Sequence, residues 1–342
     1  MKWLAVAALL AGGAARADVW QQAIDHGSPD AHAIEYDAKL RMGDDLAEQA
    51  NSHDVSAANV RRLVDLAASS YREAAAAEPS QGEPMYRLGR LLYSFYFECT
   101  DQLALRWSMS PLCATTGPFD RKHAEEVIAA WDEFEKRAPL DPRLSVDVGE
   151  ESEILFKRAI LNTRLATKPH LEAAAHDYEK LLARAQTSEI GGSPVLSNLA
   201  ETYMMLDRLD DAIDMYREAW LRGSQTSTVY GLAVALDRDD RGTQAIDLIL
   251  SQGVGSVNDF HTSVLRGETF YVPEGEKFYY FALLDEAFGK TAEAVENWRL
   301  YINSGAHPEF QPRAKAHIDA LSSGKHLHAP PPHLDDAADE SW

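Results

Sequence analysis

The side chains with the clearest capacity for metal chemistry stand at the end of the chain. The segment from 324 to 342 contains, in order, His326, His328, His333, Asp335, Asp336, Asp339 and Glu340. Imidazole and carboxylate groups together bind zinc, nickel or copper. The same segment holds three consecutive prolines, which exclude helix and favour an extended chain, so we expect a flexible tail. Such a tail does not hold ligands in place, so the histidines predict a weak metal site at most, and the alternative is a solvated tail.

Sequence motifs of the common catalytic and nucleotide-binding sites are missing from the chain. It has no HExxH, no GxSxG, no P-loop and no GxGxxG that follows a strand and opens a helix. Carboxylates are abundant, but they stand at expected turns and helix starts, where they stabilise N-termini. We therefore predict no catalytic residue and no cofactor, and we expect that the protein is not an enzyme.

The composition is that of an acidic globular protein. Among 342 residues, 54 Asp and Glu face 33 Lys and Arg, which gives a formal net charge of −21. Duplex recognition needs clustered basic residues, so nucleic acid is excluded as a partner. Hydrophobic residues make up 45% of the chain, which is ordinary for a folded domain.

The N-terminus resembles an export signal. A basic start at Lys2 is followed by an apolar run over 4–11, and Ala15-Arg16-Ala17 fits the small-x-small cleavage pattern. The run is too short to span a bilayer, and no later stretch suits a transmembrane helix. We predict a signal peptide over residues 1–17 and a mature protein that is periplasmic or secreted.

The two cysteines, Cys99 and Cys113, are close in sequence. Export places them in an oxidising compartment, where a disulfide is permitted. We therefore predict that they are joined. The competing interpretation is two buried free thiols.

The mature chain has the pattern of an all-α protein. Strong helix formers dominate, apolar residues recur at helical spacing, and Pro and Gly gather at the breaks between these stretches. Only the segment 267–275 suggests extended chain, and its proline limits that interpretation.

A repeated pattern organises these helices. Three segments carry two small residues that are 12 positions apart, at Ala200 and Ala212, at Ala233 and Ala245, and at Ala282 and Ala294. In the first segment Leu196, Leu199, Ala200 and Tyr203 share one helical face, and Ala212, Tyr216 and Ala219 share another.

This pattern resembles the tetratricopeptide repeat (TPR), a pair of antiparallel helices of about 34 residues. The resemblance implies a superhelical array of helix pairs over residues 18–323, with Ala200, Ala233 and Ala282 buried where paired helices approach closely. Two insertions interrupt the pattern, near 94–121 and 251–277. The number of repeats therefore stays open.

The resemblance also implies a concave groove lined by the first helix of each pair. Groove positions, offset from the packing positions, hold Tyr86, Arg90, Tyr93, Ser197, Glu201, Met204, Tyr230, Asp237, Tyr279 and Glu286. Tyrosine is enriched at interfaces, which favours contact with a partner. The alternative is that these rings fill gaps between neighbouring repeats.

Arrays of this family generally bind peptides or proteins, so the resemblance implies a non-catalytic scaffold of the cell envelope. The acidic groove residues Glu201, Asp237 and Glu286 suggest a basic partner. Two alternatives stay open: a binding module for a cell-wall polymer or small ligand, and an enzyme with its site in the insertions.

Overall fold

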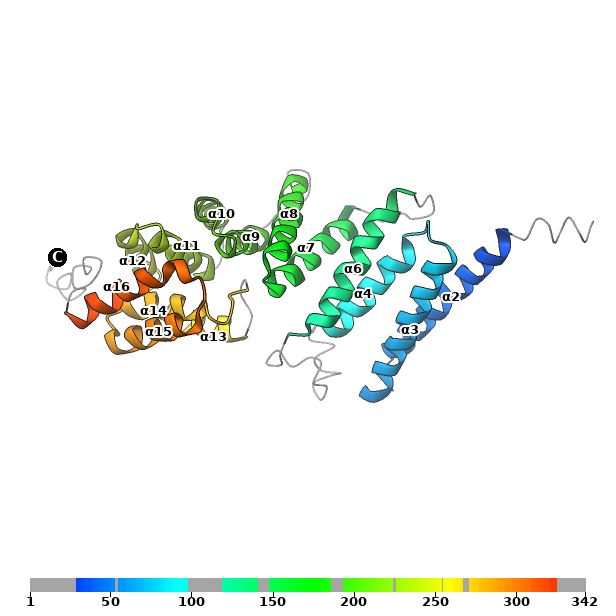
Figure 1. The fold of residues 1–342 in the computed structure, drawn as a ribbon, viewed down its shortest axis with the longest axis horizontal. Helices are drawn as coiled ribbons and strands as arrows, with labels where there is room; N and C mark the ends of the chain where they lie inside the picture. Colours follow the sequence, from blue (N-terminus) through cyan, green and yellow to red (C-terminus); the bar gives the residue numbers. More distant parts are fainter. Residues whose placement is uncertain are drawn as a thin grey trace, which may run out of the picture. The chain divides into compact units, whose positions relative to one another are not determined.

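The computed structural model describes residues 29–52, 55–97, 119–140, 148–185, 193–223, 226–253, 255–266 and 271–324. These segments contain helices and no strand, which confirms the predicted all-α fold (Figure 1). None of their helices has the length and apolar character needed to cross a membrane. The chain divides into two compact units, Met1–Ser145 (unit 1) and Val146–Trp342 (unit 2).

In unit 1, each described helix packs against the next along the chain. The helices are α2 (Pro29–Ala50), α3 (Ala57–Ala77), α4 (Glu83–Tyr96) and α6 (Arg121–Arg137), and the 3-10 turn η2 (Ala138–Leu140) follows them. The contact between α4 and α6 is aromatic, because Tyr86 lies 5.4 Å from Phe134 and Tyr93 lies 5.6 Å from Trp131, measured between ring centroids. A Cβ on Gly89 would lie 2.3 Å from Trp131 Nε1, so glycine is what lets the indole approach the α4 backbone.

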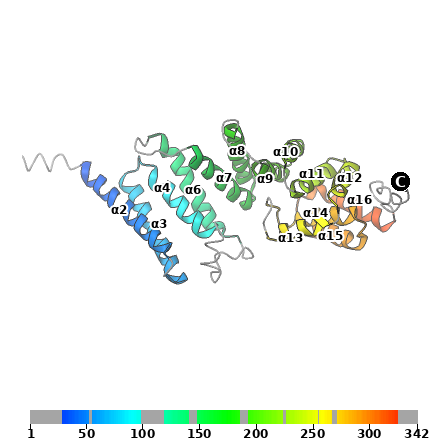
Figure 2. The same ribbon diagram turned by 180° about the vertical axis from the view of Figure 1, so that it is seen from behind.

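Unit 2 begins with four helices, each of which packs against the next along the chain. These are α7 (Val148–Leu165), α8 (Lys168–Ala185), α9 (Ser193–Met205) and α10 (Leu209–Leu221). The rest consists of α11 (Thr226–Arg238), α12 (Gly242–Leu250), α13 (Gly255–Arg266), α14 (Lys277–Ala287), α15 (Thr291–Ser304), η3 (Pro308–Phe310) and α16 (Gln311–Ser322). Helices α13, α14 and α15 lie side by side (Figure 2).

In three helix pairs of unit 2, the two helices are joined by a turn of the same type. Its central residue has a left-handed backbone in each pair, with φ of 60° at Asp207, 58° at Asp240 and 70° at Gly289. The next residue donates its N–H to a carbonyl five residues back, from Arg208 to Tyr203 (2.9 Å), from Arg241 to Leu236 (2.9 Å) and from Lys290 to Asp285 (2.8 Å). This bond belongs to the Schellman ending of a helix, which satisfies an otherwise unpaired carbonyl. The pairs α9–α10, α11–α12 and α14–α15 therefore share one connection geometry.

The small residues of the repeated pattern lie where the pairs pack. Ala200, Ala233 and Ala282 are completely buried, as the sequence predicts. A glycine serves the same purpose between neighbouring pairs, because a Cβ on Gly231 of α11 would lie 2.4 Å from Cε1 of Tyr216 on α10. Small residues therefore set how closely the helices of unit 2 approach.

The predicted insertion at 251–277 contains a helix that the sequence pattern does not indicate. Phe260 of α13 is buried, with its ring 4.8 Å from Tyr230 and 5.9 Å from Tyr280. Among the α13 side chains that the structure describes, Phe260 is the buried one, and a lone aromatic residue gives no repeat signal in the sequence. Residues 271–275, part of the segment considered as extended, are described and are not helical.

Several sequence predictions concern residues outside the described ranges. They are the signal peptide 1–17, the pair Cys99 and Cys113, and the tail with His326, His328 and His333. Most of the insertion near 94–121 also lies there. These statements stay predictions.

Candidate functional site

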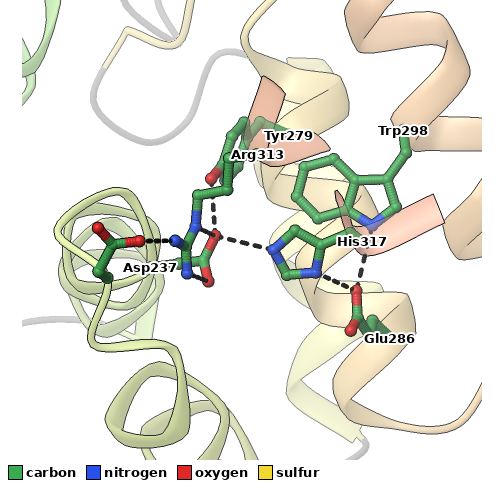
Figure 3. A network of polar contacts seen from close by, with 7 residues as sticks. Asp237, Tyr279, Glu286, Trp298, Arg313 and His317 are labelled. Carbon is green, nitrogen blue, oxygen red and sulfur yellow. Dashed lines mark hydrogen bonds and ion pairs between the residues drawn. The ribbon is translucent and has the colours of Figure 1, made fainter. Parts of the chain in front are cut away.

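The most concentrated polar chemistry of unit 2 surrounds Asp237, which is fully buried near the end of α11. Its carboxylate accepts the Tyr279 hydroxyl at 2.6 Å from α14. Arg313 of α16 reaches the same group with two nitrogens, Nε at 2.9 Å and Nη2 at 2.7 Å. His317, one turn later on α16, places Nε2 3.2 Å from it. One carboxylate thus joins three helices (Figure 3).

The His317 ring lies between two carboxylates. Its Nδ1 is 2.8 Å from Glu286 of α14, and its face stacks on Trp298 at 4.4 Å between ring centroids. Trp298 in turn donates its indole N–H to Glu286 at 3.2 Å. Burial by itself would lower the pKa of His317, but the two carboxylates outweigh it and raise the pKa to about 9. The imidazole is therefore protonated at neutral pH and donates from both nitrogens (Figure 3).

A second ion pair lies next to Asp237 in the chain. Arg238 pairs with Glu276, and less than a twentieth of either side chain is exposed. The guanidinium also lies 4.5 Å from the ring centroids of Tyr279 and Phe310, at cation–π distance. Burial would raise the pKa of Glu276, but the adjacent Arg238 charge reverses that effect and holds it at about 2.

A further buried carboxylate connects the α9–α10 pair to the α14–α15 pair. Glu201 of α9 accepts the hydroxyls of Tyr216 and Tyr280, both at 2.6 Å. Burial raises the pKa of Glu201, and the two hydrogen bonds offset part of that rise. Tyr216 belongs to α10 and Tyr280 to α14, so this contact links residues 79 positions apart.

These three clusters define what the interior can do chemically. Each buried carboxylate faces a cation or hydroxyl groups, so the groups neutralise or hydrogen-bond one another. Removing one member of such a pair leaves an uncompensated charge away from water, which is strongly destabilising. The arrangement therefore supports a role in fixing helices.

The structure places the predicted groove residues of unit 2 in its interior. The buried members are Ser197, Glu201, Met204, Tyr230, Asp237, Tyr279 and Glu286. The sequence interpretation treats these helix faces as open, whereas α13 covers Tyr230 through Phe260, and α16 engages Asp237 and Glu286. The rings of unit 2 fill the space between repeats, as the alternative interpretation has it.

In unit 1 the corresponding residues occupy a different setting. Tyr86 and Tyr93 are mostly buried against the aromatic side chains of α6, whereas Arg90 is exposed. Arg90 donates to the Tyr86 hydroxyl at 3.0 Å. Of the predicted groove residues, Arg90 is the one that solvent reaches most readily.

Sequence reasoning misses the residues that complete the Asp237 cluster. Arg313 and His317 are four positions apart on α16 and so share one helical face. Their acidic partners, Asp237 and Glu286, each precede the left-handed turn residue by three positions. Two features of the sequence could have indicated this cluster. One is the pair of acids at equivalent repeat positions, and the other is a later helix with two basic side chains on one face.

A comparison with known proteins finds no family model and no curated protein that matches this chain.

Proposed function

We propose that the protein is a non-catalytic scaffold of the cell envelope that binds another protein or a peptide. The observation that carries this proposal is the turn shared by three helix pairs. In each turn one residue has a left-handed backbone, and the next residue donates its N–H to the carbonyl five residues earlier. Together with the buried small residues 12 positions apart, it supports the resemblance to TPR arrays, which bind partners along their helices. The predicted signal peptide at 1–17 is the reason for placing the scaffold in the envelope.

The proposed contact surface lies in unit 1, around Arg90 of α4. Arg90 is exposed, whereas Asp237, Tyr279 and Glu286 of unit 2 are buried. The acidic residues that suggested a basic partner are therefore already bound within the chain. The partner of this surface is therefore a protein or peptide that need not be basic.

Site-specific photocrosslinking in the exporting host tests this surface. A photoreactive amino acid replaces Arg90 in one variant and Leu221, which is 80% exposed on α10, in a matched control. We expect a discrete protein adduct at position 90 and none at 221. Equal adducts at both positions, or none at 90 in a variant that melts like the wild type, would contradict the proposal. An adduct that resists protease but not glycosidase would favour the cell-wall polymer alternative.

A further inference from the structure

Two loops that are far apart in sequence bring metal-ligating side chains together in unit 2. Asp207 is in the turn between α9 and α10, and His307 lies between α15 and η3. Glu309 belongs to η3. One ligand atom from each of these three residues lies within 4.8 Å of the others. Two carboxylates thus converge on one imidazole.

The His307 ring lies next to the buried side chain of Glu276. Its Nδ1 lies 2.8 Å from Oε1 of Glu276, whose side chain is only 3% exposed. The other oxygen of Glu276 pairs with Arg238, so the same carboxylate contacts both side chains. Metal-binding histidines are commonly oriented in this way, with one nitrogen on a carboxylate and the other on the ion. With Nδ1 beside Glu276, Nε2 would be the nitrogen that binds an ion.

We infer that Asp207, His307 and Glu309 form a binding site for a divalent transition-metal ion of the zinc class. One imidazole and two carboxylates suit zinc, which takes three protein ligands and a water in an open tetrahedral site. Ligands about 2.1 Å from such an ion lie roughly 3.4 Å apart, so the three groups need only small side-chain rotations to close on it. Asp207 and Glu309 are exposed, so water can complete the coordination.

The turn itself does not require an acid at position 207. The equivalent residue is Gly289 in the α14–α15 turn, and Ala166 also takes a left-handed backbone between α7 and α8. Asparagine tolerates this conformation as well. Asp207→Asn therefore removes the charge of a ligand while preserving the turn.

A bound ion would tie the α9–α10 turn to the segment that leads into α16. Residues 207 and 307 are 100 positions apart, so the ion would close a long loop. The ion would stabilise the folded chain because it binds the folded state in preference to the unfolded state.

Titration of the full-length protein with Zn²⁺, after chelator treatment and dialysis, tests the site. The background is a His326→Ala, His328→Ala, His333→Ala variant, which removes the tail as a source of ligands. We expect one Zn²⁺ per chain, a rise in melting temperature, and loss of at least tenfold in affinity in Asp207→Asn and His307→Gln. Asp240→Asn makes the same change in the neighbouring left-handed turn and should bind Zn²⁺ as the background does.

Cobalt substitution adds a second readout, because Co²⁺ absorbs visibly and a thiolate ligand gives a distinct charge-transfer band. We expect weak tetrahedral bands without that charge transfer, lost in Asp207→Asn. A thiolate band would assign the ion to Cys99 and Cys113 and overturn the inference. So would Zn²⁺ binding that disappears with the tail histidines, or equal affinity in Asp207→Asn and Asp240→Asn. Should His307→Gln fail to fold, Asp207→Asn still decides the matter.

Discussion

The two units differ in where they place charge. Among the described residues of unit 1, the ion pairs lie at the surface, as where Arg87 pairs with Asp44 and Glu83, each roughly a third exposed. Unit 2 also buries charged side chains, namely those of Arg158, Asp177, Glu201, Asp237, Arg238, Glu276, Asp285, Glu286 and His317. The described part of unit 1 buries none.

This difference shows two ways of joining helices. Unit 1 relies on aromatic packing, as between Tyr93 and Trp131, which needs no charged partner. Unit 2 adds ion pairs such as Arg158 with Asp177, where two nitrogens contact two oxygens at 2.7 Å. Buried charges require their own partners because the loss of hydration is otherwise uncompensated. Unit 2 is therefore the part in which side-chain chemistry fixes one particular arrangement.

The largest expected effect comes from Asp237→Asn. This change leaves Arg313 and the protonated His317 without their shared counter-charge, at a cost of about 3–5 kcal/mol in the free energy of unfolding. Asp44→Asn in unit 1 is the matched control, with a cost below about 1 kcal/mol, because its ion pair with Arg87 is partly exposed. Urea denaturation followed by circular dichroism measures both. Equal losses would show that burial of charge does not distinguish the units.

Glycine substitutions test what the units have in common. Gly231→Ala and Gly89→Ala each force a methyl group into an aromatic ring, against Tyr216 and Trp131, and should cost about 1–3 kcal/mol. Gly255→Ala is the control, because a Cβ there meets nothing within 4 Å. Thermal melts decide the outcome, and a Gly231→Ala variant that melts with the Gly255→Ala control would mean that Tyr216 can move aside.

The protonation of His317 predicts how stability depends on pH. Its pKa is about 9 in the folded protein and about 6.5 in an unfolded chain. Its contribution is therefore complete below pH 6.5 and is lost as the pH rises through 9, with a slope of at most about 1.4 kcal/mol per pH unit.

Urea midpoints between pH 6 and 10 measure this slope in the wild type and in His317→Gln. The variant should be less stable and its profile flatter over that range. Parallel profiles would show that His317 does not carry the dependence.

The smallest expected effect belongs to a surface ion pair of unit 1. Arg72 lies 3.4 Å from Glu126, and both side chains are at least a third exposed. Arg72→Ala should change the free energy of unfolding by less than about 0.5 kcal/mol. A loss above about 1 kcal/mol in the same urea assay would give unit 1 an electrostatic contribution that its exposure does not suggest.

The sequence predicts the helices and their closest contacts well. Ala200, Ala233 and Ala282 are buried, because the same spacing in each pair reflects the same packing requirement. Local pattern is sufficient there, since the turn and both helices of each pair lie within 30 residues.

The sequence predicts the surroundings of the groove positions poorly. The repeat pattern predicts an open surface for Tyr279 and Asp237, although they contact each other across 42 residues. Helical periodicity tells which residues share a face but not what covers that face. Here α13 and α16 do so, and neither follows the repeat pattern.

The reach of α16 affects how the chain acquires its structure. In repeat proteins each unit usually contacts only its neighbours, so segments fold almost independently. Arg313 and His317 instead contact Asp237 across 76 and 80 residues. These contacts cannot form until the last helix has been synthesised, so until then the carboxylates of α11 and α14 lack the two basic side chains of α16. Unit 2 should thus fold late and as a whole, and a chain that ends before α16 would lose cooperativity over several helix pairs at once.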